Sequence, residues 1–247
     1  MQTIYILWLR ELTRYSRSRA RIIGSLGQPL LFLLALGFGL GPVFQKAGQG
    51  SYFQFLGPGV IAMSILFTAI FAGIQIIWDK QFGFLKETLV APVSRLSIML
   101  GKTLGGATIA TLQGIIVFVL TLFVGFHPNI AAIPLAIIFM LLISIFFTAV
   151  GISIASLLED MQGFQLIMNF LVQPLFFLSG ALFPINNLPK VFEMVVGLDP
   201  LSYGVDGIRG SLTGLTHYGL GIDFLVLFIM TSFILVLGSY LFSKIQL

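Results

Sequence analysis

The feature that most constrains this chain is the length of its uncharged stretches. No Asp, Glu, Lys or Arg occurs between Lys102 and Glu159, whereas a helix needs only about 20 mostly apolar residues to cross the hydrocarbon core of a bilayer. A turn signal, His127-Pro128-Asn129, divides this stretch, which therefore predicts two spans. Charged residues make up 9% of the chain, against about 25% in soluble domains. A surface so poor in charge is expected to face lipid.

Across the whole chain, the gaps between charges predict an all-α integral membrane protein with six transmembrane helices in a single domain, residues 1–247. The predicted spans are residues 22–44, 56–78, 103–126, 130–157, 163–183 and 222–242. The other segments are predicted to be an interfacial helix at 3–20, an inner loop at 79–102 with a short helix, and an outer cap of re-entrant helices at 184–221. The apolar run begins only after Arg21, which argues against a cleavable signal peptide.

The basic residues predict the orientation. With the N-terminus inside, all but three of the 13 Lys and Arg residues fall on the inner side, the exceptions being Lys46, Lys190 and Arg209. Because Lys and Arg accumulate in cytoplasmic segments, we expect a multi-pass protein of the cell (inner, cytoplasmic) membrane with both termini cytoplasmic. The net charge of +4 then follows from topology and does not indicate nucleic-acid binding.

Residue types exclude several chemistries. Cysteine is absent and the two histidines stand near no acidic cluster, so neither a metal site nor a cofactor is predicted. No span carries a charged residue near its centre, where ion-coupled carriers place one and where intramembrane enzymes need an acid, base or nucleophile. We therefore predict no catalytic residue.

Gly101-Lys102-Thr103 is like the end of a phosphate-binding loop. The glycine that the loop needs five residues earlier is replaced by Leu96, and no strand precedes it. We expect no ATP binding there, and expect Lys102 to reach the headgroups from the inner end of the third span.

Two segments outside the spans are amphipathic. Residues 3–20 carry arginines three or four positions apart beside an apolar side, which predicts a helix at the headgroups with its arginines toward anionic lipid. A basic patch that only sets the topology is the alternative. In the inner loop, Phe82, Leu85 and Leu89 share one helical face, and Pro92 ends that helix at or before Ala91. Such a helix is suited to dock a cytoplasmic partner; lying flat on lipid is the alternative.

Neutral polar residues form stripes within two spans. Gln165, Asn169 and Gln173 are four apart and share one face of the fifth span. In the second span, the stripe and its apolar neighbours are Ser64, Thr68, Gln75, Met63, Phe67 and Phe71. Such faces are suited to line a path for an amphiphilic solute. The alternative is hydrogen bonding between helices, at about 0.6 to 2 kcal/mol per bond.

The outer cap carries helix-start signals. Asp199 is predicted to cap a helix whose first residue is Pro200, and Pro189 is predicted to begin a shorter one. Asp206 and Arg209 are three apart and are placed to pair.

Several motifs together resemble one family. They are the N-terminal arginine helix, FLGPGV from Phe55, GFLKETLVAPVSR from Gly83 with Gly101-Lys102 after it, SGALFP from Ser179, Leu188-Pro189, and DPLSY from Asp199 with Asp206 and Arg209. The set is similar to the permease subunit of type-2 ABC exporters, of the drug-resistance and nodulation-factor-export kind, over nearly the whole chain. Asp199 departs from the family, which often has Asn there, but both residues cap helices.

The resemblance implies a complex of two permease copies and two separate ABC ATPase subunits, with ATP and Mg on the ATPase and no cofactor in this chain. The loop after the second span is expected to be a coupling helix that docks on the ATPase, with a smaller contact at 158–162. Its contact residues would be Phe82, Phe84, Leu85, Lys86, Glu87, Leu89, Ala91 and Pro92.

The resemblance also implies that the second and fifth spans line a path between protomers. The outer helices are expected to close this path at Pro184, Asp199, Pro200, Tyr203, Asp206 and Arg209. The expected function is ATP-driven export of a hydrophobic or amphiphilic compound, drug-like, lipid-like or glycolipid-like. A non-transport membrane scaffold or biogenesis factor partnered with an ATPase is the alternative, and the lack of charges within the spans disfavours an ion-coupled carrier.

Replacing Leu85 or Leu89 by Asp is expected to uncouple ATP hydrolysis from transport, because the carboxylate would enter an apolar docking face. Loss of one interface anchor costs about 2 kcal/mol or more, so ATP-driven transport in proteoliposomes should fall about tenfold or more, while circular dichroism shows intact spans. Gln45→Asp, which adds the same charge near the end of the first span, is the control. Normal transport by both Asp variants would refute docking through this face.

Overall fold

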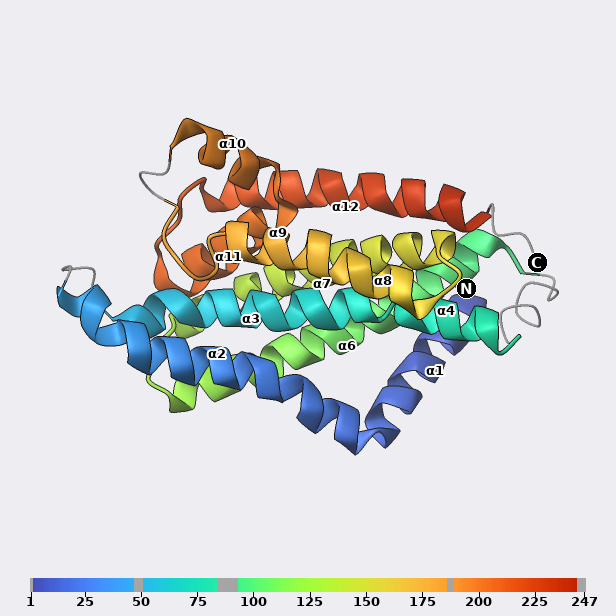
Figure 1. The fold of residues 1–247 in the computed structure, drawn as a ribbon, viewed down its shortest axis with the longest axis horizontal. Coiled ribbons are helices and arrows are strands. Elements are labelled where there is room, and N and C mark those ends of the chain that lie inside the picture. The colour runs from blue at the N-terminus through green and yellow to red at the C-terminus, as the bar shows by residue number, and fades with distance from the viewer. Residues whose placement is uncertain (1, 47–50, 84–92, 186–188, 244–247) are drawn as a thin grey trace.

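The computed structural model describes residues 2–46, 51–83, 93–185 and 189–243, and its regular elements are all helical. Figure 1 shows long helices lying side by side along one axis, with the two chain termini at the same end of the bundle. Within the described residues, six segments are long and apolar enough to cross a membrane. The all-α architecture with six spans is therefore confirmed.

The elements follow one another without a strand in the described part of the chain. They are α1 (Gln2–Arg17), α2 (Arg19–Lys46), α3 (Tyr52–Phe71), α4 (Ile74–Gln81), α6 (Arg95–Phe123), the 3-10 turn η1 (Ile130–Ala132), α7 (Ile133–Leu157), α8 (Met161–Ile167), the π turn η2 (Met168–Val172), α9 (Gln173–Leu178), α10 (Lys190–Leu198), α11 (Pro200–Thr213) and α12 (Leu220–Ser243). The candidate spans are Ile22–Lys46, Tyr52–Gln81, Arg95–Phe123, Ile130–Leu157, Met161–Leu178 and Leu220–Phe242.

The inner loop predicted at 79–102 is shorter in the structure. Helix α4 continues to Gln81 and α6 already begins at Arg95. The Ser94 hydroxyl accepts a hydrogen bond from the Ser97 backbone N–H at 3.2 Å, which caps α6 eight residues earlier than predicted. Residues 84–92, the centre of the predicted coupling helix, lie outside the described residues.

The second and fifth spans also begin or end elsewhere than predicted. The second begins at Tyr52, whose buried hydroxyl donates to the Leu182 carbonyl at 2.8 Å and so holds the first turn against the chain after α9. The fifth ends at Leu178 and not at 183, because the chain turns through Gly180 with φ of +72°. A positive φ of this size favours glycine and breaks the helix.

Helix α3 is the centre of the bundle and packs against α2, α6, α7 and α11. At its end the helix is interrupted at Ala72-Gly73, and this is where α7 comes closest. A Cβ on Gly151 of α7 would lie 2.5 Å from the Ile70 carbonyl oxygen, and a Cβ on Gly73 would collide with the Gly151 backbone. Small residues thus allow the two backbones to touch, as is common for packed helices in membranes.

The fifth span contains a π turn. Pro174 has no N–H to donate to the preceding turn, and the wider turn η2 immediately precedes it. In an ideal α-helix each step of four residues advances about 40° beyond a full turn. A π turn contains more residues per turn, so each residue rotates less about the helix axis. The rotation from Asn169 to Gln173 therefore compensates the excess of about 40° between Gln165 and Asn169. The three amides remain aligned, and all three are exposed.

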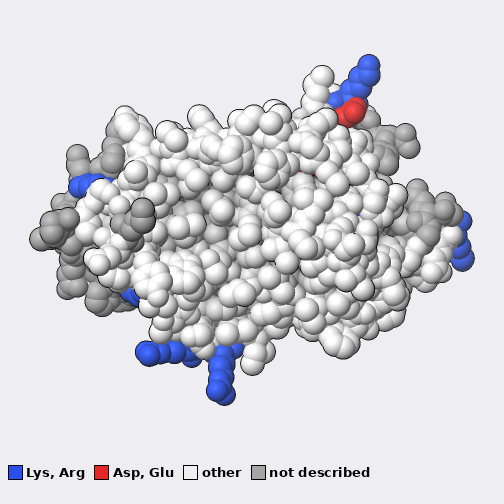
Figure 2. Space-filling model, turned by 180° about the vertical axis from the view of Figure 1, so that it is seen from behind, with Lys and Arg blue, Asp and Glu red and all other residues white. Residues whose placement is uncertain are grey.

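Helix α1 packs along α6. The two helices approach closely at Gly101 and Gly105, since a Cβ on Gly101 would collide with Leu7 and one on Gly105 would collide with Glu11. The helix predicted at 3–20 is therefore present, with a break at Ser18, while its position at the headgroups remains a prediction. Figure 2 shows a broad uncharged band across the middle of one face, with Lys and Arg towards its margins, as a lipid-facing surface requires.

Gly151→Ala is expected to destabilise the fold, because the added methyl group would overlap the Ile70 carbonyl. Overpacking of this kind costs about 1–3 kcal/mol, which should appear as a lower midpoint of thermal unfolding in detergent. The matched control is Gly39→Ala on α2, where a Cβ meets nothing within 4 Å. Equal midpoints for both variants would show that the contact between α3 and α7 is loose.

Candidate functional site

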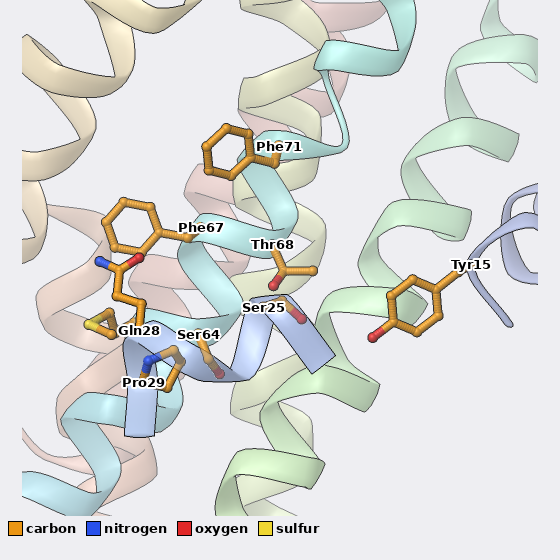
Figure 3. A pocket seen from close by; sticks show the side chains of 10 residues that line it. Tyr15, Ser25, Gln28, Pro29, Ser64, Phe67, Thr68 and Phe71 are labelled. Atoms are coloured by element: carbon orange, nitrogen blue, oxygen red, sulfur yellow. The ribbon is translucent and has the colours of Figure 1, made fainter. Parts of the chain in front are cut away.

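A cavity of about 340 Å³ lies between α1, α2 and α3, near the end of the bundle that holds the termini. Five of the predicted path residues line it, and all five come from α3. They are Met63, Ser64, Phe67, Thr68 and Phe71. Figure 3 shows the rings of Phe67 and Phe71 projecting from α3 in the same direction, while Thr68 points toward the side of Tyr15. The residues predicted on the second-span stripe, except Gln75, therefore form one wall of this cavity.

Half of the wall comes from residues that sequence reasoning did not select. They are Tyr15, Gly24, Ser25, Gln28 and Pro29. A signal for three of them exists, because Ser25, Gln28 and Pro29 interrupt an apolar run at i, i+3 and i+4. Pro29 also has no N–H to donate to the Ser25 carbonyl, which leaves an acceptor on this side of α2.

The hydroxyl groups of the cavity do not join α2 to α3. Ser64 donates to the Ile61 carbonyl at 2.8 Å and Ser25 to the Ile22 carbonyl at 2.9 Å, each within its own helix. The Tyr15 hydroxyl donates to Gln113 Oε1 of α6 at 2.8 Å. Among the described residues, no hydrogen bond from Ser64 or Thr68 to another helix is found, so their oxygens remain able to accept a hydrogen bond from a solute.

The amides of the fifth span do not reach this cavity. Gln165, Asn169 and Gln173 are exposed on one outer face of the chain. The two spans are instead connected by rings, since Phe67 lies edge-on to Phe176 with centroids 6.0 Å apart. Exposed amides within a hydrophobic span need hydrogen-bond partners, and within the described chain none is provided.

At the end of the bundle that holds the termini, Asp79 joins three helices. Its carboxylate forms an ion pair with Lys102 of α6, accepts from Arg10 of α1 at 3.4 Å and accepts from Gln75 Nε2 of its own α4 at 3.4 Å. Lys102 is only 4% exposed. The expectation that Lys102 reaches the headgroups is therefore wrong, because its ammonium pairs with the Asp79 carboxylate between the helices. Gln75, predicted on the path, belongs to this cluster.

The residues beside the cluster fix the ends of the neighbouring helices. The Lys80 ammonium donates to the Ser156 and Leu158 carbonyls at 2.6 and 3.0 Å, which satisfies carbonyls at the end of α7. Glu11 is buried and pairs with Arg14. Phe82, the one predicted coupling residue that is described, is 72% exposed. The predicted coupling residues Phe84, Leu85, Lys86, Glu87, Leu89, Ala91 and Pro92 lie outside the described residues.

At the opposite end, the predicted capping of α11 is found. Asp199 accepts from the Leu201 N–H at 2.9 Å, and Pro200 is the first helical residue. Burial raises the pKa of Asp199 to about 7, and the Leu201 N–H partly offsets this rise. The Tyr203 hydroxyl donates to the Gly197 carbonyl at 2.8 Å, so it ties α11 to the end of α10.

The ion pair predicted between Asp206 and Arg209 is not formed. Asp206 accepts from the backbone N–H groups of His217 and Tyr218 at 2.8 Å each and so closes the turn after α11. Arg209 donates to the Gly180 carbonyl at 2.9 Å and lies over the Phe55 ring, 4.0 Å from its centroid. A second cavity, of about 440 Å³, is lined by both residues and by Pro184.

Comparisons with known proteins agree with this architecture. Residues 2–213 match the family described as ABC-2 type transporter. The chain is similar to Nodulation protein J of Rhizobium meliloti (strain 1021), at 29% identity over 93% of this chain and 89% of that protein. Nodulation protein J of Rhizobium leguminosarum bv. trifolii is 30% identical over 84% and 80%. The ycf38 protein of Cyanophora paradoxa, whose name describes it as a transport permease, is 28% identical over 85% and 73%.

Asp79→Leu alone is expected to destabilise the chain strongly, because it leaves the Lys102 ammonium buried without a counter-charge. Breaking a buried pair from one side costs about 3–5 kcal/mol. The double variant Asp79→Leu with Lys102→Met removes both charges and should recover most of that loss. Thermal unfolding of the two single variants and the double variant measures the coupling. Additive losses would show that the pair contributes nothing specific.

Proposed function

Because the chain belongs to the ABC-2 type transporter family, which matches it over residues 2–213, we propose that it is the permease subunit of an ATP-driven exporter of hydrophobic or amphiphilic compounds. ATP and Mg would be bound by a separate ABC ATPase subunit, and this chain would contribute no catalytic residue and no cofactor. Two copies of the chain would form the membrane part of the complex.

The observation that carries this proposal is the composition of the cavity between α1, α2 and α3. Aromatic and thioether side chains, Phe67, Phe71 and Met63, stand beside the polar groups of Gln28 and Thr68. Mostly apolar walls with a few placed polar groups are typical of ligand sites. An amphiphile from the inner leaflet finds there both an apolar surface and hydrogen-bond partners.

The cluster around Asp79 supports a way to transmit motion from the ATPase. Asp79 precedes the proposed coupling segment and Lys102 follows it, and their ion pair joins α4 to α6. Because Arg10 also contacts Asp79, α1 would move with these helices. Closure of the ATPase subunits would displace this inner unit, and the interruption of α3 at Ala72-Gly73 is where the second span would bend.

The exposed amides of the fifth span support the proposal that two copies of the chain form a dimer. In an isologous dimer the same face meets its own copy, so Gln165, Asn169 and Gln173 would hydrogen-bond across the seam or toward a solute within it. The termini would lie on the cytoplasmic side of the cell membrane, since the excess of Lys and Arg belongs to the end that holds them.

Gln28→Leu and Thr68→Val are expected to change which amphiphiles are transported. Each variant removes one hydrogen-bonding group, worth about 1 kcal/mol or about fivefold, from the cavity wall. The measurement is the ratio of transport rates for two dyes of equal chain length, one with a hydroxyl and one without, in proteoliposomes that contain the ATPase. Ser232→Ala, on the exposed side of α12, is the control.

An unchanged ratio in both variants would show that the cavity is not on the transport path. A separate result would refute the wider proposal: uphill transport by the purified chain without any nucleotide-hydrolysing partner.

A further inference from the structure

The second cavity lies at the end of the bundle away from the termini, beside the buried guanidinium of Arg209. It has an apolar part, formed by Phe44 and Leu215, and a polar part that includes Gln54 and Thr216. Its volume of about 440 Å³ is within the range of small-ligand sites. The end of α2, the start of α3, the chain after α9, helix α11 and the turn after it form this cavity together.

Within the described residues Arg209 forms no ion pair, although the Asp206 carboxylate on the same cavity wall favours its charged form. Arg209 is 8% exposed, and every ion pair found in the described residues lies at the opposite end of the bundle, around Asp79 and Glu11. The segments near this end that the structure does not describe, 47–50 and 186–188, contain no Asp or Glu. A buried charge that no carboxylate contacts directly is costly, so the site favours a negative group that can reach the guanidinium.

The guanidinium also has donors to spare. Within the part of the chain that the structure describes, its five N–H groups meet two acceptors: Nη2 donates to the Gly180 carbonyl at 2.9 Å and to the Phe55 carbonyl at 3.4 Å. The Nε–H group has no partner in the described structure. Burial lowers the pKa of Arg209 to about 10, with Asp206 opposing the shift. The group is therefore charged at neutral pH.

Asp206, which shares the cavity wall, is already engaged. Its oxygens accept the backbone N–H groups of His217 and Tyr218, and those bonds hold it to the turn after α11. Asp206 also interacts with Asp223 and favours the charged form of Arg209. Toward an anion in the cavity it acts by electrostatic repulsion, and this repulsion provides a test of opposite sign.

We propose that this outer cavity binds the oxyanion headgroup of an amphiphile, with the oxygens at the Arg209 guanidinium and the alkyl chain against Phe44 and Leu215. A phosphate or carboxylate matches the planar donor fork of arginine. The amphiphile is either an anionic membrane lipid or the exported compound itself. In the second case this inference rests on the proposed function and names one group of the substrate.

The test measures binding in the absence of ATP, so its failure would leave the transport proposal standing. The full chain is placed in nanodiscs of phosphatidylcholine, and two probes of equal chain length are compared, dodecyl phosphate and dodecyl phosphocholine. Dodecyl phosphate is expected to bind about tenfold more tightly, since its headgroup has a net negative charge and one more free oxygen for arginine, whereas phosphocholine is zwitterionic.

Three variants determine whether Arg209 is responsible. Arg209→Gln should remove the preference for dodecyl phosphate, and Asp206→Asn should increase it, because the repulsive charge is gone while an acceptor remains. Lys46→Gln, which removes an exposed cation at the same end of the bundle, should leave it unchanged. If Arg209→Gln does not fold, the proposal is tested by the preference of the wild type for dodecyl phosphate and by the change of that preference in Asp206→Asn.

Equal binding of both probes by the wild type would overturn the proposal, as would weaker dodecyl phosphate binding by Asp206→Asn or an equal loss in Lys46→Gln. A final arm identifies the source of the headgroup. If phosphatidylglycerol in the nanodisc competes with dodecyl phosphate, the site belongs to a membrane lipid; if it does not compete, the site selects a single-chain acidic amphiphile. Either result supports an oxyanion site.

Discussion

The cost of placing a charge in hydrocarbon organises this molecule. A bilayer provides neither water nor counter-ions to a buried ionic group, so every such group must be moved to an end of the bundle or paired inside it. The chain does both. At the end that holds the termini, Asp79 contacts Lys102 and Arg10 from two other helices. At the opposite end, Arg209 is held by backbone carbonyls and an aromatic ring, and Asp206 lies on the same cavity wall without forming an ion pair with it among the described residues.

This difference between the two ends has consequences for function. The inner cluster is neutralised from within the chain, so it stabilises a fixed arrangement of α1, α4 and α6 around the segment proposed to meet the ATPase. The Arg209 guanidinium donates to backbone carbonyls and lies over the Phe55 ring, and under the proposal above it attracts a negative group. For the proposed exporter, a paired cluster at one end and an anion site at the other would suit a process in which force is applied at one side and a solute leaves at the other.

The sequence was sufficient for what depends on composition and local pattern. Charge-free stretches predict the six spans because crossing a bilayer depends mainly on the length and polarity of a segment. Asp199 and Pro200 give the start of α11 because a cap needs only neighbouring residues. The Asp79–Lys102 pair escaped prediction because it depends on how α4 and α6 approach each other after an intervening loop. Arg209 was assigned to Asp206 by helical spacing, yet two backbone N–H groups from beyond the helix compete for that carboxylate.

The cavity between α1, α2 and α3 illustrates the same limit at the candidate site. Its α3 wall was predictable, since Ser64 and Thr68 stand at helical spacing in an apolar run, but its other wall depends on the path of α2. Helix α3 then connects this cavity to both ends. Its first turns carry Phe55, whose carbonyl and ring contact Arg209, and Gly59, which packs against the Ala181 backbone. Its last turn passes through Ala72-Gly73 into α4 and Asp79. Because packed helices shift between discrete arrangements and do not deform continuously, a displacement of the inner cluster would be carried along α3 past the inner cavity to the outer one.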